Sequence, residues 1–114
     1  MLLTEFLNKL TMQPETIEFT DTMSVIETNY VFTETGFANG SQQNASGENN
    51  GSCKIFSFAQ LNNLSEAQTI ACFGRYYRDD VLGFPDANDH QNIRQFMING
   101  WSGIHFDSVA LLPK

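Results

Sequence analysis

Basic residues, cysteines and long apolar runs are all scarce in this sequence. Its 114 residues include 6 Lys and Arg against 13 Asp and Glu, which gives a net charge of -7. An acidic surface repels phosphate backbones, so we expect no nucleic-acid partner. No stretch approaches the roughly 20 consecutive apolar residues of a membrane span, and no basic segment precedes an apolar run at the N-terminus. We therefore expect no membrane partner and a cytoplasmic location.

Metal ligands are also few. Two cysteines and two histidines do not comfortably supply a zinc site. Asp86, Asn88 and His90 alternate in a way that resembles a calcium loop, but Met97 occupies the position of the bidentate Glu and excludes an EF-hand. Capping and turn formation explain these polar residues without a metal. We predict no metal and no cofactor.

The two cysteines are not expected to form a disulfide. Cys53 and Cys72 lie on opposite arms of a predicted helical hairpin that turns near Leu64. At about 1.5 Å rise per residue, Cys72 is displaced by roughly 4–5 Å along the axis from the position opposite Cys53. A disulfide requires close Cβ atoms, so we expect two reduced thiols, which are typical of a reducing compartment.

The centre of the chain carries the clearest folding signal. Ser52 precedes an apolar run and is a good N-cap candidate. Ser65, with Gln68 three residues later, has the spacing of a capping box, and Gly83 ends the second helix. Apolar residues cover much of the first helix: Cys53, Ile55, Phe56, Phe58, Ala59 and Leu61. A helix that is apolar on most sides is packed on several faces, so the pattern predicts a helical hairpin over 52–82 as the core.

The N-terminal part predicts two short helices and a strand. Apolar residues at helical spacing indicate a helix over 2–10. A second helix is expected over Thr22–Asn29, with Asp21 or Thr20 as its cap. The segment 30–37 alternates with period two, is rich in β-branched and aromatic residues, and is the best strand in the chain.

The C-terminal part predicts a further helix. Asp89 is expected to cap it, because Ile93, Phe96 and Met97 then form its inner face. Gly100 is expected to end it.

Two more signals concern strand pairing. Asn39-Gly40 favours a hairpin turn, and the polar return segment 41–44 is either an edge strand or a loop. A terminal strand over 104–106 is expected to pair with 31–35.

Together these patterns predict an α+β fold. It is a mainly helical single domain over residues 1–114, with the helical hairpin 52–82 as its core. A small antiparallel β-sheet is expected from residues 30–37 and 103–107.

Four segments resemble a known family: NNGSCKIFSFAQL, ACFGRYYRDDVLGFPDANDHQNIRQFM, GWSGIHF and FTETGFANG. They are similar to the HopJ family, which is named for a type III effector of plant-pathogenic bacteria. The resemblance spans nearly the whole chain and implies one HopJ-like domain of a bacterial protein. The cytoplasmic location expected above therefore has an alternative, which is secretion by a type III system if the family name applies to this chain. It transfers no catalytic residue to this chain.

The catalytic candidates are Cys53, His90 and Asp89. Cys53 is expected at the first position of a helix, where the helix dipole favours a thiolate. His90 lies near the start of another helix and could act as its base, oriented by a carboxylate such as that of Asp89. Alternatively, Cys53 packs as a small core residue and His90 bonds a backbone carbonyl.

The ligand-binding candidates are Asn49, Asn50, Ser52 and Arg94. The first three belong to a loop whose N–H groups precede a helix N-terminus, which is a general anion-binding arrangement. Arg94 could approach this loop and add positive charge.

Other exposed groups have two interpretations each. Arg75 and Arg78 could join the anion site, or they are surface charges, with Arg75 spaced four residues from Asp79. Tyr76 or Tyr77 faces outward and could form a protein-binding patch with Trp101, or these rings are largely buried. The oligomeric state cannot be read from these residues.

Two functions follow from these features. The first is a non-enzymatic interaction protein with an unidentified protein partner. The alternative is a small enzyme, or a domain that binds a small anion or other ligand, using Cys53, His90 and the neighbouring Asn, Asp and Arg side chains.

Overall fold

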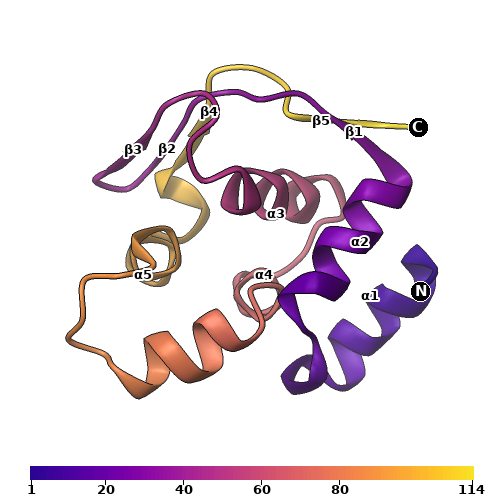
Figure 1. Cartoon of the computed structure of the whole chain (residues 1–114), viewed down its shortest axis with the longest axis horizontal. Helices are drawn as coiled ribbons and strands as arrows, with labels where there is room; N and C mark the ends of the chain where they lie inside the picture. The colour runs from indigo at the N-terminus through magenta and orange to yellow at the C-terminus, as the bar shows by residue number, and fades with distance from the viewer.

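Helix α3 (Asn50–Leu61) lies at the centre of the molecule, and the other elements surround it in the computed structural model, which describes residues 1–114 (Figure 1). The other elements are α1 (Leu3–Met12), η1 (Pro14–Thr16), α2 (Phe19–Asn29), β1 (Tyr30–Phe32), β2 (Phe37–Asn39), β3 (Gln42–Asn44), α4 (Glu66–Ala71), η2 (Tyr76–Val81), α5 (Gln91–Asn99), η3 (Gly100–Gly103), β4 (Ile104–Phe106) and β5 (Leu111–Pro113). This is the predicted α+β fold, a mainly helical single domain with a small antiparallel sheet.

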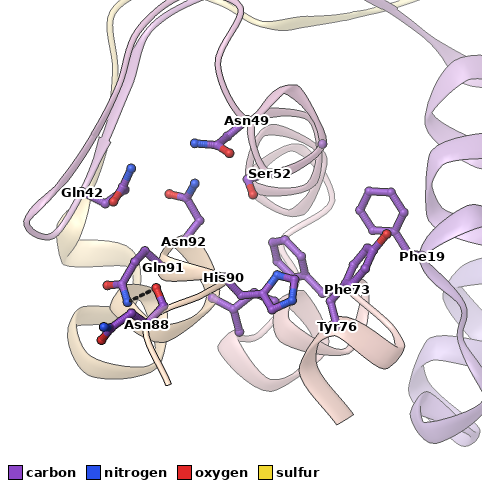
Figure 2. Close-up of a pocket in the computed structure, with 12 residues that line it drawn as sticks. Phe19, Gln42, Asn49, Ser52, Phe73, Tyr76, Asn88, His90, Gln91 and Asn92 are labelled. Atoms are coloured by element: carbon purple, nitrogen blue, oxygen red, sulfur yellow. Dashed lines mark hydrogen bonds between the residues drawn. The ribbon is translucent and has the colours of Figure 1, made fainter. Parts of the chain in front are cut away.

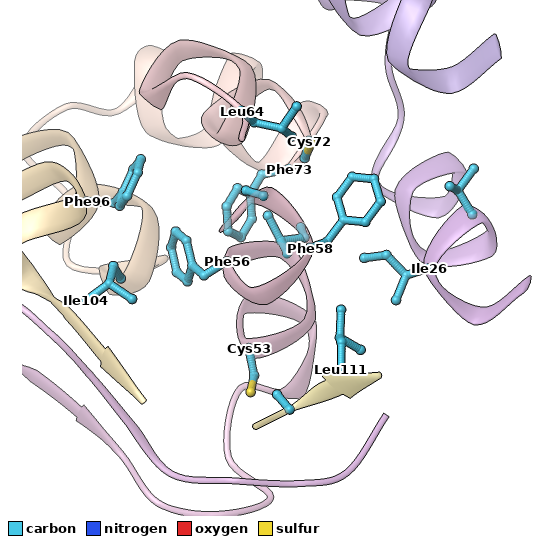
Figure 3. Packing of buried hydrophobic residues seen from close by; sticks show 14 of the residues in the cluster. Ile26, Cys53, Phe56, Phe58, Leu64, Cys72, Phe73, Phe96, Ile104 and Leu111 are labelled. Atoms are coloured by element: carbon cyan, nitrogen blue, oxygen red, sulfur yellow. The ribbon is translucent and has the colours of Figure 1, made fainter. Parts of the chain in front are cut away.

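Helix α3 is buried on most of its circumference, as its composition predicts. Its buried residues are Cys53, Ile55, Phe56, Ser57, Phe58 and Ala59. The Phe56 ring lies 5.6 Å from that of Phe73 and 5.0 Å from that of Phe96 (Figure 3). The Phe58 ring meets the Tyr30 ring edge-on at 5.9 Å. Aromatic pairs of this kind add about 0.5–1.5 kcal/mol each beyond the area they bury, so these contacts attach elements from both halves of the chain to α3.

The second arm of the helical hairpin is broken, which is a correction to the prediction of one helix as far as residue 82. It starts with the predicted capping box, in which the Gln68 N–H donates to Ser65 Oγ at 3.1 Å. Helix α4 then ends at Ala71. Gly74 has a φ of 61°, and a Cβ there would lie 2.6 Å from the backbone nitrogen of Phe19. The chain changes direction at this glycine, and the π-helix η2 leads away from α4 (Figure 1).

The strand predicted over 30–37 consists of two strands that enter different sheets. β1 pairs with β5, a strand that the sequence did not predict. β2 pairs with both β3 and β4, so the terminal strand adds to Phe37–Asn39 and not to the predicted 31–35. The irregular segment between β1 and β2 is held by the C-terminal part of the chain, since the Thr33 N–H donates to the Ala110 carbonyl at 2.8 Å. The polar strand β3 is an edge strand, one of the two predicted alternatives.

Helix α2 begins earlier than predicted. Its first residue is Phe19, and Glu18 occupies the N-cap position in place of Asp21 or Thr20. Asp21 instead supplies the other half of a capping box, because its carboxylate accepts the Glu18 N–H at 3.1 Å.

The N-caps predicted for α3 and α5 are also wrong. Asn49 precedes α3 and His90 precedes α5, so neither Ser52 nor Asp89 is a cap. Both cap residues have left-handed backbone, with φ of 53° and 50°.

The inner face of α5 differs from the predicted one at a single position. Ile93 and Phe96 are buried as expected, but Met97 is 46% exposed. Asn92 is also buried on the inner face, and its side chain donates a hydrogen bond to Asn44 there. Gly100 ends the helix, as predicted, with a φ of 58°.

Candidate functional site

A cavity of about 510 Å³ lies between the starts of α3 and α5 and helix η2 (Figure 2). Its lining residues are Phe19, Gln42, Asn49, Gly51, Ser52, Phe73, Tyr76, Asn88, His90, Gln91, Asn92 and Ile93. Amide side chains and a hydroxyl are grouped on one side, and aromatic rings on another. None of the lining residues is Asp or Glu, although the chain contains 13 of them. No carboxylate therefore lines this cavity, although the protein as a whole is acidic.

The start of α3 leaves unpaired backbone N–H groups at this cavity. The left-handed Asn49 turns the chain into the helix, and its carbonyl accepts the Cys53 N–H at 3.0 Å. The N–H groups of Gly51 and Ser52 precede this bond and have no protein acceptor, as is general for a helix start. Both residues line the cavity.

The start of α5 contributes in the same way from another side. The His90 carbonyl accepts the Ile93 N–H at 3.0 Å, so the N–H groups of Gln91 and Asn92 have no protein acceptor. These two residues also line the cavity. Each helix N-terminus carries a partial positive charge of roughly half an elementary charge. Two such ends therefore meet at one cavity, and each presents its partial positive charge there.

A buried amide network holds the two helix starts in place. The Asn92 side chain donates to Asn44 Oδ1 at 3.0 Å, and Asn49 donates to the same oxygen at 2.7 Å. Asn39 donates to the Asn92 backbone carbonyl at 2.7 Å. The network thereby links α3, α5 and the β2–β3 hairpin. Sequence reasoning treated Asn39 as a turn residue and missed its role, because only the pairing of distant segments places it beside α5.

His90 is oriented by a carboxylate, but not the predicted one. Its Nε2 lies 2.9 Å from Asp80 Oδ2 and 3.9 Å from Asp89 Oδ2. The imidazole packs against the Tyr76 ring at a centroid separation of 5.1 Å, and Tyr76 in turn meets Phe19 edge-on at 5.1 Å. His90 therefore lines the cavity as part of an aromatic wall, with one ring nitrogen held by Asp80. It does not bond a backbone carbonyl, contrary to the alternative raised from sequence.

Cys53 lies in the core and is not among the residues that line the cavity. It occupies the fourth position of α3, not the predicted first. Its Sγ is 3.9 Å from the Thr35 carbonyl oxygen, and it is a free thiol. Burial raises the pKa of Cys53 to about 11, so the thiol is protonated at neutral pH. The structure thus does not bring Cys53 and His90 together at the cavity.

The side chain of Arg94 is hydrogen-bonded to the loop that precedes α5. It donates to the carbonyls of Phe84, Pro85 and Asp89 at 3.0, 3.1 and 2.6 Å, and its guanidinium meets Asp89 Oδ1 at 2.7 Å. The hydrogen bond from Arg94 holds the pKa of Asp89 below its ordinary value. Neither Arg94 nor Asp89 lines the cavity.

Neither of the other two arginines lines the cavity. Arg75 pairs with Glu18 at 3.4 Å rather than with Asp79 as its spacing predicted. Arg78 donates to the Ile17 carbonyl at 2.7 Å and meets the same glutamate at 3.5 Å. No arginine lines the cavity, so the partial positive charges at it are those of the two helix starts.

The remaining candidates are separated by the fold. Asn50 donates to Glu34 Oε1 at 3.3 Å and does not line the cavity, whereas its neighbours Asn49 and Ser52 do. Trp101 packs edge-on against Phe96 at 5.0 Å and does not line the cavity.

The described residues include no group of three or more His, Cys, Asp or Glu that could hold a metal ion. No helix has both the length and the apolar composition needed to cross a membrane.

Fold and site together define a small α+β protein with a polar cavity where two helices begin. The HopJ type III effector protein family matches residues 3–111, so the chain belongs to this family, as the sequence resemblance indicated. A solved structure described as "Crystal structure of unknown function protein VPA0580" is 58% identical, with a TM-score of 0.98, over 100% of this chain and 95% of that one. No curated protein matches the chain.

Proposed function

We propose that this HopJ family member is a non-enzymatic binding protein whose cavity receives the anionic group of a small molecule, a carboxylate or a phosphate. One observation carries the proposal: the N-termini of α3 and α5 meet at a cavity that no carboxylate lines. This corresponds to the anion- or ligand-binding alternative raised from sequence. Its residues are Asn49, Ser52 and His90 from that set, joined by Gln91 and Asn92.

Helix starts bind anions because their free N–H groups point along the axis and their dipole favours negative charge. Each such interaction contributes about 0.3–1 kcal/mol at an exposed site. Two starts, together with the amides of the lining, give a ligand several donors at once. The net charge of -7 acts against anions at long range, so the ligand must be small enough for the local donors to dominate.

The aromatic rings on the other side of the cavity indicate which kind of chemical group the ligand carries beside its anion. The rings of Phe19, Tyr76 and His90 form a continuous packed series, with centroid separations of 5.1 Å at both contacts. A flat or apolar group attached to the anion can pack against these rings, because binding sites combine apolar walls with a few placed polar groups.

Binding is favoured over catalysis because no activated nucleophile faces His90. Ser52 lines the cavity but has no hydrogen bond to the imidazole. Cys53 is buried and its pKa is raised to about 11, which opposes thiolate formation. A nucleophile normally requires a base within hydrogen-bond reach.

The test uses amide chemical shifts in two-dimensional NMR. Inorganic phosphate and benzoate are expected to shift the Gly51, Ser52, Gln91 and Asn92 amides in a saturable way. Benzylamine has the same ring with the opposite charge and is expected to leave them unchanged. Equal shifts with benzylamine, or none with either anion, would exclude an anion site.

A matched pair of variants locates the site. Ser52→Asp places a carboxylate in the cavity at the third position of α3, where acidic residues favour a helix, so the fold is retained while anion binding is lost. Ser52→Asn is similar in size but neutral and is expected to bind benzoate as the wild type does. Unchanged binding by Ser52→Asp would contradict the proposed site.

We also propose that the protein acts in the bacterial cytoplasm. Two free buried cysteines support a reducing compartment. The family name points instead to type III secretion, and the two are distinguished by comparing culture supernatants of strains with and without a type III apparatus. Appearance of the protein only when the apparatus is present would replace the cytoplasmic proposal with secretion.

A further inference from the structure

His90, which lines the cavity, is hydrogen-bonded through only one of its two ring nitrogens. Nε2 lies 2.9 Å from Asp80 Oδ2, whereas the Asp89 carboxylate is 3.9 Å away and pairs with Arg94 at 2.7 Å. An ionised carboxylate only accepts hydrogen bonds, so Nε2 carries a proton and donates it to Asp80. In a neutral imidazole one nitrogen is a donor and the other an acceptor, which makes Nδ1 the acceptor.

Nδ1 has no hydrogen-bond partner in this chain, and it is accessible. The buried side-chain polar atoms that lack a partner are Asn39 Oδ1 and Asn50 Oδ1, so Nδ1 is not enclosed in the core. The His90 side chain is 27% exposed, and one face of its ring packs against Tyr76 within the cavity lining (Figure 2). The aromatic wall of the cavity therefore includes an unpaired hydrogen-bond acceptor.

The polar groups at the cavity are thus of two kinds. The starts of α3 and α5 present backbone N–H donors, which are suited to an anion. His90 Nδ1 presents an acceptor, and an anion cannot hydrogen-bond to it, because an anion is itself an acceptor. A ligand that pairs with both kinds of group must carry a hydrogen-bond donor in addition to its anion.

From this arrangement we infer that the preferred ligand is a small aromatic acid whose ring bears a hydroxyl or N–H group. Its anion binds at the two helix starts, and its donor binds His90 Nδ1. This inference rests on the anion-binding function proposed above and specifies the ligand of that site. Asp80 is a positioning residue, because it acts on the ligand only by fixing the proton on Nε2. The cavity volume of about 510 Å³ lies within the usual range of small-molecule sites.

The position of the ring proton is tested first, by a long-range ¹H–¹⁵N NMR spectrum that separates protonated from unprotonated ring nitrogens. The chain has two histidines, and His105→Gln at an exposed position of β4 leaves His90 as the only one. At about pH 8, above the usual titration range of histidine side chains, we expect Nε2 to be protonated and Nδ1 unprotonated. A proton on Nδ1, alone or together with one on Nε2, would overturn the inference.

The ligand class is tested with 3- and 4-hydroxybenzoate, each compared with the methoxybenzoate of the same substitution. The methoxy oxygen has no proton to donate, so each pair differs in the proposed hydrogen bond. Amide-shift titrations are expected to show roughly two- to tenfold tighter binding of at least one hydroxybenzoate than of its methoxy partner, which is the usual range for one hydrogen bond. That ligand is also expected to shift the His90 Nδ1 resonance, and benzoate is not.

The titrations separate failure of this inference from failure of the anion site. If all the benzoates shift the Gly51, Ser52, Gln91 and Asn92 amides but the hydroxy and methoxy forms bind equally, the anion site stands and the inference about the donor is wrong. If none of them shifts these amides, the anion site itself is wrong, and the inference falls with it.

A matched pair of variants tests the role of Asp80. Asp80→Ala frees Nε2, so the ring proton is no longer fixed and the advantage of the hydroxybenzoate over its methoxy partner is expected to shrink toward onefold. Asp79→Ala removes the same charge from the neighbouring exposed position, whose carboxylate makes no ion pair, and is expected to keep the wild-type advantage. The ¹⁵N spectrum of Asp80→Ala should show a mixture of the two ring tautomers, which a purely structural role would not produce. An unchanged advantage in Asp80→Ala would contradict the assigned role.

Discussion

Gly74 is the position where a single methyl group should distort this protein most clearly. It interrupts the second arm of the hairpin with a φ of 61° and thereby directs η2, with Tyr76, toward the cavity. A Cβ at this position would lie 2.6 Å from the backbone nitrogen of Phe19 and 3.1 Å from Glu18 Cα. Backbone atoms of a packed helix cannot rotate away, unlike the end of a flexible side chain.

The expected magnitude for Gly74→Ala has two parts. A non-glycine residue in the left-handed region is disfavoured by about 1–2 kcal/mol. Forcing a methyl group into a filled space costs about 1–3 kcal/mol more. We therefore expect a loss of about 2–5 kcal/mol out of the roughly 5–15 kcal/mol that stabilises a domain.

Gly83 provides the matched control, because the same substitution there should have the opposite sign. Gly83 is at the end of the helical segment, has no positive φ, and has no atom within 4 Å of an added Cβ. Gly83→Ala is expected to stabilise the protein by about 0.4–1 kcal/mol, because it restricts the unfolded chain. Urea denaturation of both variants measures the two values. Equal stability of Gly74→Ala and wild type, or the same sign for both substitutions, would refute the reasoning.

Three further predictions concern buried polar groups and titration. Asn92→Ala leaves amide groups of its network unpaired and should cost about 1–3 kcal/mol in urea denaturation, whereas the exposed Asn88→Ala should stay within about 0.5 kcal/mol. Burial raises the pKa values of Cys53 and Cys72 to about 11 and about 12, so above pH 9 the unfolded state releases thiol protons that the native state retains. Stability should therefore fall as pH rises from about 9 toward 11, and the fall should be smaller in Cys53→Ala, as followed by urea midpoints. Arg94 lowers the pKa of Asp89, so this carboxylate contributes stability above about pH 4 that is lost at lower pH, and Asp89→Asn should show a shallower acid loss.

Several elements were predictable because their signals are local. The Ser65–Gln68 capping box lies within four consecutive residues and forms as predicted. The burial of α3 follows from its composition, and Gly100 ends α5 because glycine adopts a positive φ readily. The absence of a disulfide was also expected, and both cysteines are free.

The errors arose where a local signal competed with a distant contact. Ser52 and Asp89 are good caps by composition, but Asn49 and His90 take those positions. The amide network that fixes Asn49 joins residues 48 positions apart in the chain, Asn44 and Asn92. The break at Gly74 depends on the close approach of the start of α2. Strand β4 pairs with β2, and the segment before β2 is bonded to the C-terminal part of the chain through Thr33 and Ala110 and through Gly36 and Asp107.

The candidate site was predicted in part for the same reason. Asn49, Ser52 and His90 were named as candidates and line one cavity, whereas Cys53, Asn50, Asp89 and Arg94 do not. Nothing in the sequence indicates that His90 pairs with Asp80 or packs on Tyr76, because those contacts depend on the path of the chain after Gly74.

The sequence by itself determined the family, the α+β class and the helix at the centre, since composition and period specify which segments must be buried. Only the tertiary structure decided that two helix starts share one cavity, which arginines are engaged elsewhere, and which carboxylate binds His90. Side-chain periodicity acts over a few residues, whereas a binding surface depends on the relative placement of segments that are far apart in the chain.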